Sequence, residues 1–174
     1  MSVRLQRLWD EHSHLYSRIE RLRATADACG LLSLGTLRNQ IDDLYRMLRR
    51  EVIPHARAEE ETLYPLVEHL MDAPYASATM VRDHGEIAML TQELRGFQLG
   101  LAPPQAQPDV IGLRRVLYSL YAIIVLHIAK EEEYYFPLLK VRLTDAQLED
   151  LFAKMEDAEA RARREAELEA SAKA

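Results

Sequence analysis

Two segments of the sequence place a histidine four residues before the first of three consecutive glutamates. The first segment, HARAEEETLYP, begins at His55, and the second, HIAKEEEYYFP, begins at His127. Residues four apart lie on the same face of a helix, so His55 is paired with Glu59 and His127 with Glu131. Imidazole and carboxylate together suit Fe, Zn, Mn or Cu better than Ca or Mg. The two segments therefore point to a transition-metal site.

A further histidine precedes each of these pairs at a fixed distance. His12 comes 43 residues before His55, and His84 comes 43 residues before His127. His12 and His84 are 72 positions apart, and His55 and His127 are separated by the same 72 positions. The chain therefore has the pattern of two helical hairpins of one design, each with a single histidine on its first helix and a His–Glu pair on its second.

The lengths of the hairpin arms bring these side chains to one level. From His12 to the end of its helix is about 22 Å at the α-helical rise, and from the start of the next helix to His55 is about 27 Å. The second hairpin repeats this arrangement. We therefore expect one polar layer inside the bundle that consists of His12, His55, Glu59, His84, His127 and Glu131.

This layer favours two metal ions over one. Burying two carboxylates without partners is costly, and no Lys or Arg shares their helix faces at this level. Four imidazoles, two bridging carboxylates and one oxo or hydroxo bridge would fill most coordination positions of two octahedral ions, leaving about two for solvent or a small ligand. The sequence thus predicts an open two-metal site.

Other polar residues near the pattern do not fit the layer. His14 faces away from His12, and His69 lies about 21 Å along its helix from His55. The remaining acids of the two runs turn away by more than about 100° and are expected in solvent; they are Glu60, Glu61, Glu132 and Glu133. We assign none of these residues to the metal.

The helical period dominates the rest of the chain, and no strand pattern is convincing. Loops at residues 28–36, 71–77 and 100–109 separate four long helices, which predicts an all-α, up-down-up-down four-helix bundle over residues 1–140. A capping box at Thr144 begins an extra C-terminal helix, residues 144–174, that ends as a solvated, fraying charged tail. Pro54 should bend its helix, and Pro65 and Pro137 should bend or end theirs.

Charge and composition limit the kinds of partner and the cellular compartment that we expect for this chain. The formal net charge of −6 argues against nucleic acid. The apolar run YSLYAIIVLHIA is too short to span a membrane and reads as a core helix. The N-terminal stretch has no apolar signal region, so we expect a cytoplasmic protein. The single cysteine, Cys29, permits no disulfide within the chain and is expected to be structural.

The motifs, taken in order, resemble the hemerythrin-like, or HHE cation-binding, family. They are Glu11-His12, HxxxEE…LYP from His55, Asp83-His84, and HxxxEE…YFP from His127. The resemblance covers about residues 1–140. It implies a four-helix bundle with a non-haem di-iron centre that reacts with oxygen species. Motif matching assigns the same six residues of the polar layer as ligands. A ferritin-like Glu-x-x-His pattern is absent.

Two positions depart from the oxygen-carrying members of that family. Carriers place a second histidine one turn before the third-helix ligand, where this chain has Met80, matched by Leu8 in the first hairpin. Carriers also space their last pair by five residues, which would select Glu132 here; we prefer Glu131 because Glu59 has spacing four. One histidine fewer opens a coordination position, which disfavours reversible O₂ carriage.

Three functional hypotheses follow. The first is a di-iron protein, or another transition-metal protein, that binds or reacts with O₂, peroxide or NO, with a peroxide-decomposing enzyme as one form of it. The second is an iron- or oxygen-sensing regulatory module without turnover, and the third is a metal-free structural bundle. Near the site, Tyr16 could donate a hydrogen bond or an electron, while Met80 and Leu8 would form an apolar lid that limits water.

Overall fold

The computed structural model describes residues 6–103 and 106–172, with side chains up to residue 168. All regular structure in these ranges is helical, and η denotes a π-helical segment. The elements, in chain order, are α1 (Gln6–Ala28), α2 (Leu34–Met47), η1 (Leu48–Val52), α3 (Ile53–Ala58), η2 (Glu59–Leu63), α4 (Tyr64–Met71), α5 (Ala78–Gly100), α6 (Val110–Lys130), η3 (Glu131–Tyr135), α7 (Phe136–Arg142) and α8 (Asp145–Ala172).

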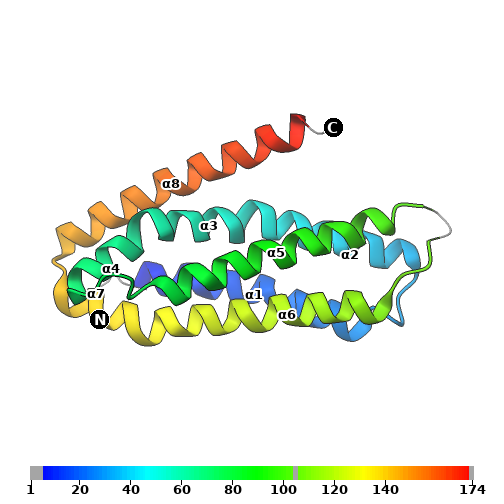
Figure 1. Ribbon diagram of the computed structural model, residues 1–174, viewed down its shortest axis with the longest axis horizontal. Coiled ribbons are helices and arrows are strands. Elements are labelled where there is room, and N and C mark those ends of the chain that lie inside the picture. The colour runs from blue at the N-terminus through cyan, green and yellow to red at the C-terminus, as the bar shows by residue number, and fades with distance from the viewer. Residues whose placement is uncertain (1–5, 104–105, 173–174) are drawn as a thin grey trace.

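Four long helices form an up-down-up-down bundle, and α8 is added outside it (Figure 1). The second long helix continues from α2 through α4, and the fourth continues from α6 through α7. Helix α1 packs against α6 and α2, while α5 packs against α6, α2 and α3. The predicted all-α bundle with an extra C-terminal helix is therefore confirmed.

The three helical prolines are accommodated by π turns rather than by helix ends. A proline has no N–H to donate, and in each case the residue before it donates to a carbonyl five residues back. Tyr64 N–H bonds to the Glu59 carbonyl before Pro65, and Phe136 N–H bonds to the Glu131 carbonyl before Pro137. The helices therefore continue past both prolines, so the expected end of the helix does not occur at either one. Single-turn π segments are frequent at functional sites.

Two apolar clusters fill the bundle and leave a polar layer between them. The larger one includes Ile19, Leu44 and Leu120. It fills the half of the bundle near the α1–α2 and α5–α6 connections. The smaller one includes Leu8 and Met80 and lies at the end where α4, α7 and α8 meet. Leu8 and Met80 are both buried, as expected of an apolar cover on one side of the layer.

Helix α8 packs along the second long helix, against α3, η2 and η1. The predicted capping box is present: Gln147 N–H donates to Oγ1 of Thr144, and Thr144 N–H donates to Oε1 of Gln147. The expectation of a fraying, solvated tail is wrong for α8 as far as Ala162, whereas residues 163–168 are mostly exposed. Ala158 and Ala162 are buried, and Arg161 pairs with Glu61. Small alanine side chains allow this close packing, although they form no conspicuous apolar stripe in the sequence.

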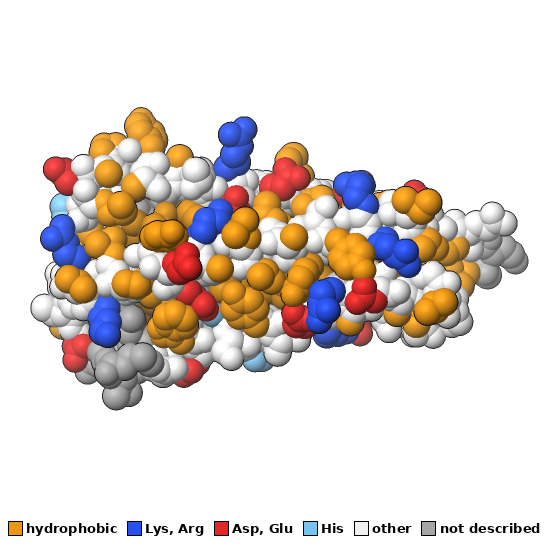
Figure 2. Space-filling model, turned by 90° about the horizontal axis from the view of Figure 1, so that it is seen from below, with side chains coloured by type: hydrophobic (Ala, Val, Ile, Leu, Met, Phe, Trp, Pro, Cys, Tyr) orange, Lys and Arg blue, Asp and Glu red, His pale blue; other side chains and the backbone are white. Residues whose placement is uncertain are grey.

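The fourth long helix, residues 110–142, is long and apolar enough to cross a membrane when judged by length and composition alone. In the structure it packs along α1 and α5 and directs His127 and Glu131 into the interior. Its outer face carries exposed Ile111, Tyr118 and Leu126. Figure 2 views this side, where apolar side chains alternate with charged ones.

Candidate metal centre

The six predicted side chains meet at one level of the bundle interior. His12 comes from α1, His84 from α5 and His127 from α6, while His55 comes from α3. Glu59 and Glu131 are the first residues of the π segments η2 and η3. All are buried except His55, whose side chain is 17% exposed. His14 and His69 are exposed and lie outside this layer, as predicted.

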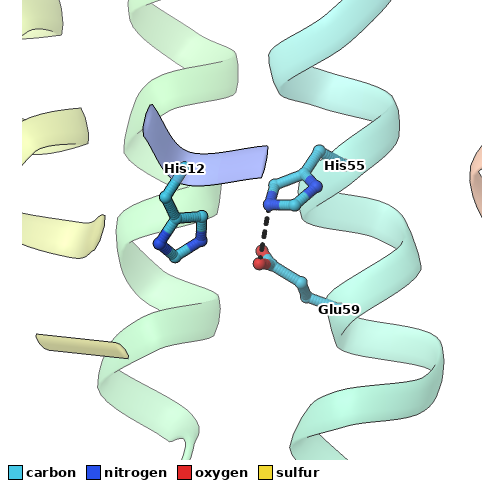
Figure 3. Close-up of side chains that lie close together, drawn as sticks. All are labelled: His12, His55 and Glu59. Carbon is cyan, nitrogen blue, oxygen red and sulfur yellow. Dashed lines mark ion pairs between the residues drawn. The ribbon is translucent and has the colours of Figure 1, made fainter. Parts of the chain in front are cut away.

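His12, His55 and Glu59 form one group that could hold a metal ion, with a ligand atom from each within 4.8 Å of the others. Figure 3 shows the two imidazoles and the carboxylate turned toward one another between their helices. Nε2 of His55 lies 2.9 Å from Oε1 of Glu59. The ring centroids of the two histidines are 5.9 Å apart.

Glu59, His84 and His127 form a second such group. Nε2 of His84 lies 3.4 Å from Oε2 of Glu59 and 2.9 Å from Nε2 of His127. Glu59 is thus common to both groups, so its carboxylate lies between the two sets of imidazoles. This placement is the one expected of a bridging ligand.

Glu131 also spans the two groups. Its Oε2 lies 3.5 Å from Nε2 of His12, and its Oε1 lies 3.6 Å from Nε2 of His127. One carboxylate oxygen therefore faces each group. The two hairpins contribute glutamates in equivalent positions, as the 72-residue repeat predicts.

Three buried atoms of the layer make no well-formed hydrogen bond: Nε2 of His55, which has only its ion pair with Glu59, Oε2 of Glu59 and Oε2 of Glu131. A buried polar atom without a partner costs about 1–3 kcal/mol, more if it is charged. A cation among these atoms would supply the missing interaction for all three. The donor set of imidazoles and carboxylates suits a transition-metal ion, so the residues present fit such a group.

Residues 3–139 match the sequence profile of the Hemerythrin HHE cation binding domain. The chain belongs to this family. No curated protein and no solved structure is significantly similar to it. The matched region contains all six residues of the layer and ends before α8. The family binds metal cations, and this HHE domain has His and Glu groups that could hold a metal.

The electrostatics of the HHE domain show how its layer is balanced without metal. Burial lowers the pKa of His12 to about 4, although Glu59 opposes the shift. Burial also disfavours charge at His55, but the adjoining Glu59 carboxylate outweighs it and raises the pKa of His55 to about 10. Burial and repulsion from Glu59 hold the pKa of Glu131 well above its usual range. Both shifts favour the protonated form, of His55 and of Glu131, in the metal-free layer.

Carboxylates outside the layer contact the outer nitrogens of three of its four histidines. Nδ1 of His12 lies 3.1 Å from Glu132, and Nδ1 of His84 lies 2.8 Å from Glu60. Glu60 is exposed, as expected, but still reaches His84, whereas Glu132 is only 21% exposed, so the expectation of full solvation is wrong for Glu132. Successive residues of a π turn rotate by less than the roughly 100° of an α-helix, which brings the second acid back toward the site.

The third of these contacts is between Nδ1 of His127 and Oδ2 of Asp83, at 3.3 Å. An ionised carboxylate can only accept, so each of these three rings carries its proton on Nδ1. When such a ring carries no second proton, the lone pair of its Nε2 is directed into the layer, where a metal would need it. Carboxylates in this role are typical of metal-binding histidines and raise the basicity of the ligand.

The tyrosine hydroxyl at the centre is that of Tyr64, which the sequence analysis missed. Its hydroxyl donates to Oε1 of Glu131 at 3.0 Å and lies 3.2 Å from Nε2 of both His84 and His127. The 72-residue repeat could have indicated Tyr64. Its equivalent in the second hairpin is Phe136, so both hairpins have an aromatic ring at this position and only Tyr64 adds a hydroxyl.

Tyr16, the tyrosine chosen from the sequence, is only half-buried and packs against the larger apolar cluster. Burial raises the pKa of Tyr16, and the charge of Glu132 contributes to the shift. Tyr16 therefore lies outside the polar layer, against the larger apolar cluster.

Proposed function

We propose that this HHE domain is a non-haem di-iron protein that binds or reacts with O₂, peroxide or NO. The observation that carries the proposal is the pair of three-residue groups that share Glu59. One group would hold each ion, and Glu131 faces both. The proposed ligands are His12, His55, Glu59, His84, His127 and Glu131.

The iron pair, when bound, would supply Lewis acidity and electrons for the chemistry of oxygen species. The chain's own part begins with orientation. Glu132, Glu60 and Asp83 fix three of the imidazoles through Nδ1, so that little reorganisation is needed on metal binding.

Tyr64 would supply the hydrogen-bond donor of the site. Burial raises the pKa of Tyr64, and the carboxylates of Glu59 and Glu131 raise it further, so its hydroxyl keeps its proton. A small ligand within the layer would meet this O–H group. Its position between His84 and His127 supports a role in orienting such a ligand.

Apolar side chains at the α4, α7 and α8 end of the bundle would limit the access of water to the polar layer. Leu8 and Met80 are buried in the cluster beside the layer, and Phe136 packs over the His12 ring at a centroid distance of 4.9 Å. Low local polarity strengthens the interactions of the buried charges. Access by bulk water from this end would therefore be restricted.

A second candidate is an iron- or oxygen-sensing module without turnover. It is favoured by the contact of α8 with η2, the segment that begins at Glu59. Arg161 of α8 pairs with Glu61, two residues after that proposed ligand. A change of metal occupancy at Glu59 would be felt directly at the surface that holds α8.

Reconstitution with iron tests the proposal. We expect about two irons per chain and near-ultraviolet absorption typical of oxo-bridged iron. Release of O₂ on addition of hydrogen peroxide would identify the enzymatic form. Stable iron content without turnover, together with a change in protease sensitivity of α8, would identify the sensor. A protein that retains no iron after reconstitution would contradict both.

A further inference from the structure

His55 differs from the other three histidines of the layer at its outer edge. Its Nδ1 has no hydrogen-bond or ion-pair partner among the described residues. The 72-residue repeat places Glu11 where Asp83 serves His127, but Glu11 is held elsewhere. Arg7 donates to Glu11 at 3.0 Å and also pairs with Glu156 of α8. The ring of His55 is therefore fixed on its inner side alone.

A groove of about 840 Å³ lies between α1, η1, α3 and α8, and His55 forms part of its wall. The same residue lines a small interior cavity, about 20 Å³, together with Glu59 and Glu131. Its side chain is 17% exposed, whereas those of His12, His84 and His127 are at most 5% exposed. The His55 ring thus separates the groove from the unpartnered oxygens of the interior.

The charges along the groove favour a cation. Six acids and four arginines line it, and three of these arginines are paired with carboxylates. Arg18 pairs with Glu51 at 2.8 Å, and Arg163 pairs with Glu159 at 2.6 Å. The same pairs involve four of the six acids, so the groove keeps a modest formal excess of two negative charges. A negative cleft raises the local concentration of cations and their association rate.

We propose that metal ions reach the interior through this groove and that His55 is the ligand that moves to admit them. The inference rests on the proposed function, because the layer must bind metal for a route to matter. A ring without an outer carboxylate can rotate toward the groove, whereas the rings held by Asp83, Glu60 and Glu132 cannot do so without breaking a hydrogen bond. Helix α8, which lies outside the family match, forms one wall of this route.

Filling the groove tests the route. Ala160 of α8 lines it, so Ala160→Trp should obstruct it. Ala153, also on α8, is exposed and does not line it, so Ala153→Trp is the matched control. We expect anaerobic uptake of Fe²⁺ by the metal-free 174-residue chain to slow by at least about tenfold in Ala160→Trp, with the same final iron content. The control should load at the wild-type rate.

A charge change tests the same route without adding bulk. Glu159→Gln removes a carboxylate from the groove, and Asp157→Asn removes one from the same helix outside it. We expect Glu159→Gln to slow Fe²⁺ uptake about two- to threefold at low salt, and the difference to vanish at high salt. Asp157→Asn should have no such effect.

The outcomes separate the route from the proposed function. If the wild-type protein loads iron, and Ala160→Trp and Glu159→Gln load at the wild-type rate, the route is wrong while the metal site stands. If the wild-type protein takes up no iron, the proposed function fails and the route fails with it. Slow loading confined to the two groove variants supports both.

Discussion

Nδ1 of His12 lies 3.1 Å from Oε1 of Glu132, so an acid of the second hairpin fixes a histidine of the first. The reverse contact joins Glu60 of the first hairpin to His84 of the second at 2.8 Å. Each hairpin therefore orients a proposed metal ligand of the other. Neither hairpin alone contains a fully oriented set.

Loss of Glu132 should weaken metal binding without removing a proposed ligand. In Glu132→Gln the amide is neutral and binds the His12 N–H less strongly, so we expect metal affinity to fall by about 10- to 100-fold. Glu133→Gln is the matched control, because Glu133 is the adjacent acid and is exposed. Competition with a calibrated chelator measures both. Equal metal affinities for the two variants would show that Glu132 does not support metal binding.

Glu59→Gln should have a larger effect, because Glu59 is common to both candidate groups. We expect iron content after reconstitution to fall below about one per chain, since both ions lose a carboxylate ligand. Glu61→Gln, which alters an exposed acid of the same run, should retain the wild-type content. Elemental analysis measures the iron content of both variants. Full iron content in Glu59→Gln would show that Glu59 does not bridge two ions.

Metal binding should release protons. His55, with its pKa raised to about 10, carries a proton at neutral pH in the metal-free protein and must lose it to bind a metal. Apparent metal affinity should therefore rise with pH below about 10, by roughly tenfold per pH unit for each proton displaced. An indicator dye in weak buffer measures the release. A pH-independent affinity between about pH 6 and 8 would contradict this balance.

Tyr64→Phe should preserve the fold, because Phe136 occupies the equivalent position in the second hairpin. In the metal-free protein the change removes the donor to Oε1 of Glu131, which should lower the free energy of unfolding by about 1–3 kcal/mol. Tyr16→Phe, at a half-buried position, is the control and should cost less. Urea unfolding of the two metal-free variants compares them. In the iron-loaded protein, Tyr64→Phe should also alter the reaction with peroxide or NO.

The fold and the six residues of the layer were predictable because they follow from periodicity. The 72-residue repeat fixed which histidines are equivalent, and the helical rise placed His12 level with His55. The spacing of four put Glu59 and Glu131 on the inner face. Regular geometry was sufficient for each of these inferences.

The remaining features depend on irregular geometry. Glu60 and Glu132 reach the site because π turns before Pro65 and Pro137 change the helical rotation, and an α-helical projection does not contain that change. Tyr64 is placed by the same turn. The packing of α8 depends on buried Ala158 and Ala162, which a search for large apolar residues overlooks.

Anomalous diffraction at the iron edge, from crystals of the iron-loaded protein, tests the central claim most directly. The account predicts two iron peaks in the interior, one among His12, His55 and Glu59 and the other among Glu59, His84 and His127. Iron found only at the surface, or no interior peak in protein that has been exposed to iron, would contradict it.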